Sequence, residues 1–533
     1  MPTLTLDVAL FSVFLAITLI VGLSRSVKDF KDYALGGKNF STATLVATII
    51  ATFYGGGSLF RALEKTYSIG LYYSIAMVGA PIGLWLSGRL AVRMREFLNN
   101  VSVAEAMGGM YGKTVRMITA MSGIMGKTGA VAIQFQVISR ILAILFNFES
   151  VSATFIAAGI VIVYSAFGGI RAVTFTDVLQ FFTFGTLIPV LALAIWSSLQ
   201  DHTQVAATLA SNPLFDFKAV VGWTPQFMST LGLLLYFAIP TFYTPELFQR
   251  IAMAKNVTQA KNSLTYAAGI ALLILLIYSW VGILLLADNP GLEPTQVVAC
   301  MINKYAGTGL RGLMGIGVTA LAMSTADSCL NTSSVLFAND IVKPLTRQDN
   351  SSVSTARIFS LVMGLGALLI ALYSKDLLFI LLLSGSFYMP IFTVPMLLAI
   401  LGFRSTQKAV LIGMAAGFMT VVLWSIFWNN ADSIAPGMLA NLIGLLGSHY
   451  LLREKGGWKK AAPNSPLALA RKERRKAWKE RIEALRSFKP YAYLQHNLPQ
   501  QEYFYLLLGL YILAASYASL YTLADTLAGL YQP

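Results

Sequence analysis

The segment TIIATFYGGGS, residues 48–58, lies inside an apolar run from about residue 41 to residue 63. That run is long enough to cross a lipid bilayer as a helix, which takes roughly 20 residues. Three successive glycines suit a continuous helix poorly, because each costs about 1 kcal/mol relative to alanine. Broken backbone is tolerated in hydrocarbon only where it lines a cavity or packs in protein. The segment predicts either a broken helix at a transport site or a close helix–helix contact through small residues.

The composition is that of a polytopic membrane protein. The 533 residues have a mean hydropathy of +0.66, and 56% are apolar while only 12% are charged. A soluble domain carries about 25% charged residues. The net charge of +15 is explained by Lys and Arg in cytoplasmic loops, so no nucleic-acid partner is expected. Two cysteines and three scattered histidines form no transition-metal pattern, and no cofactor is expected.

Fourteen apolar spans can be placed, at about residues 5–23, 41–63, 70–90, 117–147, 151–169, 175–198, 222–249, 263–287, 309–340, 357–374, 377–402, 408–428, 434–451 and 502–527. The first lacks a basic N-terminal region and a cleavage site, so we expect a retained span and no signal peptide. Lys and Arg gather in every odd-to-even loop, including Arg250, Lys255 and Lys261 after the seventh span. This alternation predicts a multi-pass protein of the plasma (inner) membrane with both termini outside.

Spans two to six and seven to eleven form two sets of five, and an odd number of spans per set predicts an inverted repeat. The first helix of one set contains the three glycines, and the first helix of the other contains Pro240 and Pro245. Proline removes a helical hydrogen bond, and interruptions at matching positions in two halves indicate a transport site. The predicted units are 1–40 (first span and basic loop), 41–200 and 201–405 (two five-helix repeats), 406–452 (two added spans), 453–501 (linker) and 502–533 (last span).

The segment 453–489 differs from the rest of the chain, with thirteen Lys or Arg against four Glu. Within it Trp478, Ile482, Leu485 and Phe488 recur at helical spacing, which predicts a basic amphipathic helix. A cytoplasmic linker resting on anionic lipid heads is favoured over a segment that binds a protein partner.

Three ordered motifs carry a family resemblance. Residues 166–180 read AFGGIRAVTFTDVLQ, in what we expect to be a cytoplasmic loop before the sixth span. Residues 321–332 read LAMSTADSCLNT in the ninth span, which ends with NDI at 339–341, and FQR at 248–250 follows the seventh. Together they resemble the sodium/solute symporter family of sodium-coupled proline, pantothenate, sugar and iodide carriers, over about residues 5–450. The resemblance implies an all-α LeuT-like 5+5 inverted repeat with extra N- and C-terminal spans and about 14 transmembrane helices, and no enzyme.

The resemblance also implies a sodium site. Its ligands would be the carbonyl oxygens of Ala51, Tyr54 and Leu321 with the hydroxyls of Ser324 and Thr325. Na⁺ is a hard cation that prefers oxygen ligands, and a broken helix frees carbonyls. The alternative is that the two hydroxyls bond only to their own helix, as Ser and Thr often do.

Asp177 and Ser328 are predicted, again by resemblance, to form a second, more cytoplasmic cation site or a release path. We group Asp327 with them, because a carboxylate inside a span is expensive unless it is used or paired. The alternative for Asp177, which we place where the sixth span meets the cytoplasm, is an electrostatic tie to nearby Arg171.

The predicted solute site departs from better-known relatives. Proline carriers have an acidic residue and sugar carriers an amide where this chain has Phe53, and sugar carriers have polar residues where it has Gly57 and Ser58. Free N–H groups at the start of the outer half-helix would suit a carboxylate, and so would Arg61, which could instead reach the outer surface or pair with Glu64. The predicted solute-binding residues are Phe53, Gly55, Gly56, Gly57, Ser58, Arg61 and Gln134.

Several polar side chains in the fourth span stay open to two interpretations. Lys127, Gln134, Gln136 and Arg140 either face the pathway or pair with Glu246.

The sequence as a whole predicts a sodium-coupled symporter that imports a small polar organic solute, with an amino acid or a carboxylate as the favoured solute class. The alternatives are a transporter-like solute sensor and a proton-coupled carrier that uses Asp177 and Asp327. The expected partners are the solute, Na⁺ and the lipid bilayer.

Overall fold

The structure is a computed structural model of the chain. It describes residues 2–23, 27, 29–146, 148–199, 202–240, 243–346, 351–373, 376–428 and 433–458, with isolated positions between 469 and 483. The predicted last span, residues 502–527, and most of the predicted linker, residues 453–501, lie outside the described residues.

The described chain is almost entirely helical. Its first part contains α1 (Pro2–Leu23), α2 (Phe30–Leu35), α3 (Thr42–Phe53), α4 (Gly56–Ile69), α5 (Leu71–Met77), α6 (Gly79–Ala91), α7 (Val103–Tyr111), α8 (Lys113–Phe146) and α9 (Ser150–Ser198). Then follow α10 (Thr203–Ser211), α11 (Phe217–Val220), α12 (Pro225–Ala238), α13 (Pro245–Ala252), α14 (Val257–Asp288), α15 (Val297–Tyr305) and α16 (Leu310–Val335). The remainder comprises α17 (Lys343–Thr346), α18 (Val353–Tyr373), α19 (Leu377–Ser386), α20 (Val394–Leu401), α21 (Gln407–Trp428) and α22 (Ile434–Leu451). A two-stranded antiparallel sheet joins β1 (Phe403–Arg404) to β2 (Gly457–Trp458).

Within the described residues, nine helices are long and apolar enough to cross a membrane, and the bent pair α3–α4 makes a tenth. Helical residues cover the first thirteen predicted apolar runs. The first run and the fifth contain only shorter apolar helices, at Leu6–Ile20 and Ser150–Val163. The division into fourteen membrane spans therefore stays a prediction.

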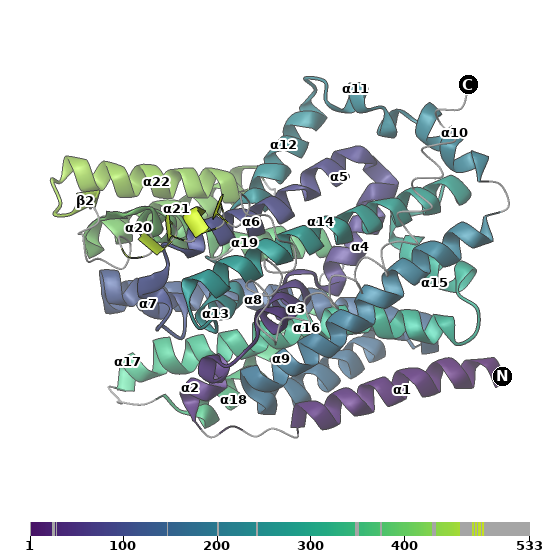
Figure 1. Cartoon of the computed structure of the whole chain (residues 1–533), viewed down its shortest axis with the longest axis horizontal. Helices are drawn as coiled ribbons and strands as arrows, with labels where there is room; N and C mark the ends of the chain where they lie inside the picture. The colour runs from purple at the N-terminus through teal and green to yellow at the C-terminus, as the bar shows by residue number, and fades with distance from the viewer. Residues whose placement is uncertain are drawn as a thin grey trace.

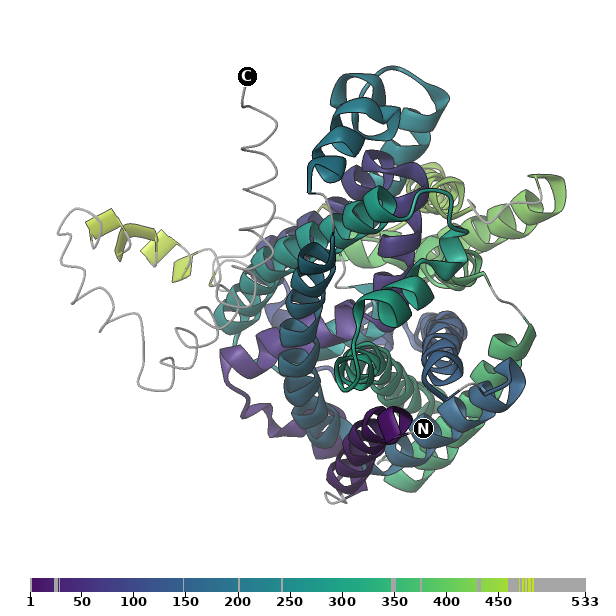
Figure 2. The same ribbon diagram turned by 90° about the vertical axis from the view of Figure 1, so that its right-hand side faces the viewer.

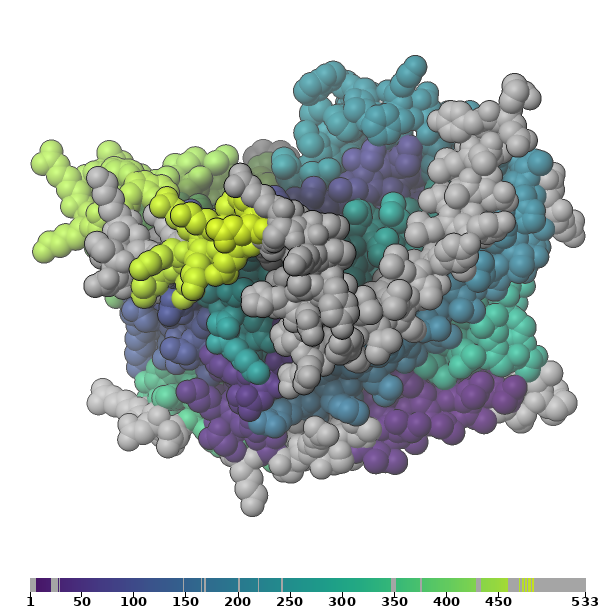
Figure 3. Space-filling model, in the orientation of Figure 1, coloured from purple at the N-terminus to yellow at the C-terminus, as the bar shows by residue number. Residues whose placement is uncertain are grey.

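The helices are arranged around a buried centre made by α3, α8, α9 and α16 (Figure 1). Helix α16 is buried over nearly its whole length and packs against α8 and α9. Helix α1 runs along one edge of the bundle against α9, and the turned view places the N-terminus at that edge (Figure 2). Helices α11 and α12 project at the top of the molecule in this view (Figure 3). The centre of the bundle is thus the part farthest from surrounding lipid and water.

The predicted loop before the sixth span is wrong. Residues 150–198 form one kinked helix, α9, in which only Gly169 has non-helical angles (φ 61°, ψ −178°). Such a conformation is almost exclusive to glycine, so a single residue redirects the chain and no loop is needed. The motif at residues 166–180 therefore lies on a helix that enters the buried centre.

The kink makes Gly169 a sensitive position. A Cβ there would have the wrong φ and would lie 2.7 Å from the ring of Tyr33. We expect Gly169→Ala to destabilise the protein by about 1–3 kcal/mol, measured as a lower thermal midpoint in detergent. Gly159→Ala is the matched control on the same helix, because no atom lies within 4 Å of its Cβ position. Equal midpoints for the two variants would contradict this account of the kink.

Candidate functional site

The predicted interruption of the second span is present. Helix α3 ends at Phe53, α4 begins at Gly56, and the two axes differ by 56°. Tyr54 and Gly55 between them are extended, with ψ angles of 93° and 169°. A helix end leaves its last carbonyl oxygens without intrahelical donors. The break therefore presents the carbonyls of the last turn of α3 to the centre of the bundle.

The three glycines do different things: the helix break and the close helix–helix contact occur at different positions. A Cβ on Gly55 would lie 2.7 Å from Thr325 Oγ1 and 3.0 Å from the Gln134 amide. Gly56 and Gly57 are already helical, and Cβ atoms there would collide with side chains of α8, Val137 and Ile133. Gly55 therefore makes room for the site, whereas Gly56 and Gly57 allow close helix packing and do not line the cavity described below.

Helix α16 brings its hydroxyls to the break. Thr325 Oγ1 donates to the carbonyl oxygens of Ala51 (3.4 Å) and Thr52 (3.3 Å). Ser324 instead donates to Asp177 Oδ1 at 2.5 Å. Leu321, one turn earlier on α16, is fully buried. Neither hydroxyl is therefore confined to bonding its own helix, which was the alternative for both residues.

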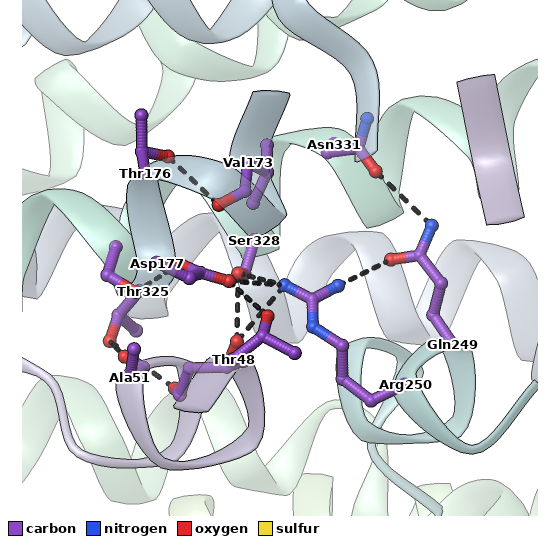
Figure 4. Close-up of polar contacts among 12 residues, drawn as sticks. Thr48, Ala51, Val173, Thr176, Asp177, Gln249, Arg250, Thr325, Ser328 and Asn331 are labelled. Atoms are coloured by element: carbon purple, nitrogen blue, oxygen red, sulfur yellow. Dashed lines mark hydrogen bonds and ion pairs between the residues drawn. The ribbon is translucent and has the colours of Figure 1, made fainter. Parts of the chain in front are cut away.

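A buried arginine is the largest departure from the sequence prediction. Arg250, expected in a cytoplasmic loop, lies on α13 and its side chain is fully buried. Its Nη2 donates to Ser328 Oγ (2.5 Å), Thr52 Oγ1 (3.1 Å) and Asp177 Oδ2 (3.2 Å), as Figure 4 shows. The guanidinium thus lies between two residues predicted to hold a second cation.

Asp177 is at the centre of this network. Its carboxylate accepts bonds from Ser324, Arg250 and, from α3, Thr48. The side chain of Asp177 is fully buried in the bundle. The alternative tie to Arg171 is wrong, since Arg171 pairs with Asp32 at 2.8 Å near the surface.

Asp327 is fully buried on α16, and Ser165 of α9 donates a hydrogen bond to its carboxylate. Asp177 and Ser328 are brought together by their shared contact with Arg250.

A cavity of about 170 Å³ lies beside the break. Its polar lining comprises Thr52, Tyr54, Gly55, Ser58, Arg61, Lys127, Gln134, Tyr236, Tyr243, Thr244, Glu246, Thr325, Cys329 and Tyr388. Phe53 and Phe237 add aromatic walls. Thr325 contacts the Ala51 carbonyl and also lines the cavity, so it joins the broken helix to the space where a solute could lie.

The polar side chains of the fourth predicted span were expected either to face the pathway or to pair with Glu246, and they differ from one another in this respect. Lys127 of α8 pairs with Glu246 of α13 at 2.8 Å, and both line the cavity. Arg140 pairs instead with Glu64 at 3.1 Å. Gln134 lines the cavity and accepts a bond from Gly57 N at 3.4 Å.

Arg61 matches neither of its predicted alternatives. Glu64 is engaged by Arg140, and Arg61 is 8% exposed, so it does not reach the surface. Its Nη2 donates a long bond to Ser58 Oγ (3.4 Å), its guanidinium also interacts with the buried Tyr73, and its Nε has no partner among the described residues. Arg61 is thus a buried cation that lines the cavity without an ion-pair partner in the described chain.

Three residues of the network were missed from the sequence. Thr48 and Thr52 are four residues apart, which puts both hydroxyls on one face of α3, toward Asp177 and Arg250. Arg250 follows Glu246 by four residues in the same way. The i,i+4 spacing of polar residues next to the helix breaks could have indicated these three residues. Arg250 was instead counted among the basic residues of a cytoplasmic loop.

The geometry of the site indicates a class of protein, independently of any comparison with known proteins. The broken pair α3–α4 and the helices α12 and α13 line a polar cavity in the buried centre of a helical membrane protein. This is the arrangement of secondary transporters.

Comparisons with known proteins give the family. The sequence matches the profile of the Sodium:solute symporter family over residues 33–417, and the chain belongs to that family. It is 22% identical over 472 residues to the sodium/proline symporter of Escherichia coli (strain K12), covering 82% of this chain and 91% of that protein. It is 26% identical over 447 residues to the human high affinity choline transporter 1, covering 76% and 74%. Like that family, it is a sodium-coupled transporter and not an enzyme.

A solved structure shares the fold. The chain matches a Na⁺-coupled sialic acid symporter in a substrate-bound outward-open state with a TM-score of 0.73 and 20% sequence identity. The match covers 84% of this chain and 98% of that one. The predicted LeuT-like helical fold is therefore confirmed, while the 5+5 division is not tested by this likeness.

Proposed function

We propose that this protein imports a small polar organic solute, an amino acid or a carboxylate, together with Na⁺ across the plasma (inner) membrane. The observation that supports the proposal most directly is that Thr325 lies both at the helix break and in the wall of the cavity. Its hydroxyl touches the carbonyl oxygens freed at the α3 end, and its side chain also lines the cavity. An ion held there would be in contact with the walls of the solute site, which is what coupling requires. Relatives named for proline and choline transport agree with a small organic solute.

The proposed sodium site keeps the five predicted ligands, the carbonyls of Ala51, Tyr54 and Leu321 and the hydroxyls of Ser324 and Thr325. Thr325 already bonds the Ala51 carbonyl. Ser324 bonds Asp177, so a sodium ion there would lie one hydrogen bond from a carboxylate. Oxygen ligands of this kind suit a hard monovalent cation.

For Asp177 and Ser328 we favour a release path over a resident second sodium ion. Arg250 donates to both side chains, at 3.2 Å and 2.5 Å. A sodium ion at that place would have to displace the guanidinium from its carboxylate partner. An ion leaving the main site can instead pass along Asp177, whose other oxygen faces Ser324. Asp327, held separately by Ser165, has no proposed role in this step.

The proposed topology places α3–α9 and α12–α20 in two inverted five-helix repeats, with the N-terminus outside. The matching breaks support this division, since α3 ends at Phe53 and α12 ends at Ala238, each followed by a second half-helix. Pro245 starts that second half-helix at a position where proline is favoured. Substituted-cysteine labelling from outside at the α10–α11 connection would check the orientation.

One flux experiment separates the proposed function from the alternatives. Purified protein in proteoliposomes is first screened for solutes that stabilise it against heat in Na⁺ but not in K⁺. The solute found is then offered under an inward Na⁺ gradient, an inward H⁺ gradient, or neither. We expect accumulation only with the Na⁺ gradient. Accumulation with H⁺ alone would indicate a proton-coupled carrier, and binding without accumulation would indicate a sensor.

A further inference from the structure

The charges of the Arg, Lys and Glu side chains that line the cavity do not cancel. They are Arg61, Lys127 and Glu246, two cations and one anion. Lys127 and Glu246 neutralise each other through a 2.8 Å ion pair whose side chains are 6% and 10% exposed. Arg61 has no carboxylate partner in the described part of the chain, and the acid one turn away on its helix, Glu64, is held by Arg140. The cavity therefore carries a net charge of one positive unit.

A buried cation without a counter-ion is costly, because the protein interior does not replace the hydration it loses. The Nε of Arg61 is buried and makes no hydrogen bond within the described residues. A guanidinium binds a carboxylate with two parallel hydrogen bonds. The side chain thus favours a solute carboxylate that bonds Nε together with one terminal nitrogen.

A second group in the same cavity also lacks a partner. Glu246 uses Oε1 for Lys127, while its Oε2 is buried and accepts nothing in the described chain. The hydroxyl of Thr244, which also lines the cavity, is unpartnered in the same way. Glu246 Oε2 can only accept a hydrogen bond as long as Glu246 is ionised. The solute should therefore bring a donor to this end of the cavity.

The neighbouring Lys127 ammonium disfavours a positively charged donor at this position. An ammonium bound to Oε2 would share one carboxylate with the Lys127 ammonium, and like charges at such distance repel in a poorly hydrated site. A hydroxyl or amide N–H supplies the hydrogen bond and adds no charge. A monoanion then balances the charge of the cavity's own side chains, whereas a zwitterion leaves one positive side-chain charge uncompensated.

Resting on the proposed function, we propose that the solute is a monocarboxylate whose far end carries an uncharged hydrogen-bond donor. Its carboxylate bonds Arg61 beside Ser58, and its hydroxyl or amide donates to Glu246 Oε2. This narrows the proposed class, since ordinary zwitterionic amino acids fall outside it. The aromatic residues Tyr243, Tyr388 and Phe237, which also line the cavity, suit an apolar linking chain.

The test uses compounds of the same chain length that differ in their charge or in their terminal hydrogen-bond donor. The probes are ω-hydroxyvalerate, ω-aminovalerate, valerate and ω-hydroxyvaleramide, with the butyrate and caproate series to allow for length. Binding to the purified full-length protein in Na⁺ is measured by calorimetry. For the length that fits, we expect the hydroxy acid to bind about ten-fold or more tighter than the amino acid and than the unsubstituted acid, about 1.4 kcal/mol. The uncharged amide should not bind.

Three variants test the roles assigned to the charged residues. Lys127→Gln removes the competing ammonium and should invert the order, so that the amino acid binds tighter than the hydroxy acid. If that variant does not fold, the double variant Lys127→Gln/Glu246→Gln keeps the net charge at one and should still bind the hydroxy acid, while Arg61→Gln should bind no carboxylate. These comparisons do not depend on transport.

Three results would overturn the proposal. They are tighter binding of the amino acid by the wild-type protein, equal binding of the amide, and no binding of any carboxylate in the three series. Each can occur while a Na⁺ gradient still drives uptake of another solute, in which case the proposed function stands and only this inference fails. Failure of Na⁺-driven uptake for every solute would instead remove the proposed function.

Discussion

Asp177→Asn should destabilise the folded protein by about 3–5 kcal/mol, because it leaves a buried arginine without its carboxylate. Arg250 is fully buried, and Asp177 is the residue that forms an ion pair with it in the described chain. Asparagine keeps the shape and the acceptor oxygen but removes the charge. The measurement is the yield of monodisperse protein in detergent and its thermal midpoint.

The chain offers a matched control for this prediction. Asp32 pairs with Arg171 at a similar distance, but the two side chains are 28% and 42% exposed. An exposed pair contributes about 0–1 kcal/mol, so Asp32→Asn should remain close to wild type. The double variant Asp177→Asn/Arg250→Gln should recover part of the loss, because it removes the uncompensated cation. Equal midpoints for Asp177→Asn and Asp32→Asn would contradict the buried network.

Gly55→Ala is expected to raise the Na⁺ concentration for half-maximal uptake by about ten-fold or more, equivalent to at least 1.4 kcal/mol. The backbone at Gly55 (φ −87°, ψ 169°) is open to any residue, so the fold should survive. The added methyl would lie 2.7 Å from Thr325 Oγ1, with the Gln134 amide at 3.0 Å on another side. The hydroxyl must therefore leave the Ala51 carbonyl.

Two other glycines control for this effect. Gly269→Ala on α14 meets no atom within 4 Å and should change neither stability nor Na⁺ dependence. Gly57→Ala would place its methyl 2.4 Å from Ile133 Cγ2 of α8. It should lower the thermal midpoint, because it separates two packed helices. A Gly55→Ala protein with wild-type Na⁺ dependence would show that the break does not hold the ion.

The sequence was informative wherever one local rule decided the outcome. Three glycines in an apolar run predicted the break between α3 and α4, and Pro245 predicted a new helix start in the second half. Both follow from backbone energetics that a few residues settle by themselves. Helical residues across the predicted apolar runs follow equally from hydropathy.

The sequence was least informative where distant helices decide the partner of a charge. The rule that loop cations face the cytoplasm placed Arg250 in water, whereas α13 packs it against Asp177, 73 residues earlier in the chain. Glu64 has a possible partner on its own helix in Arg61 and pairs instead with Arg140 of α8. The ion-pair partner of a charged side chain depends on how the helices cross in three dimensions. Residue spacing and composition do not contain that information.

The central claim is that Na⁺ at the break and solute in the cavity stabilise each other through Thr325. The direct measurement is the binding linkage in purified protein, with the solute Kd determined with and without Na⁺ and the Na⁺ Kd with and without solute. The two affinity ratios must be equal in any one variant. We predict a large common ratio for wild type and Thr325→Ser, which keeps the hydroxyl, and a ratio near one for Thr325→Ala. An unchanged ratio in a well-folded Thr325→Ala protein would contradict the account.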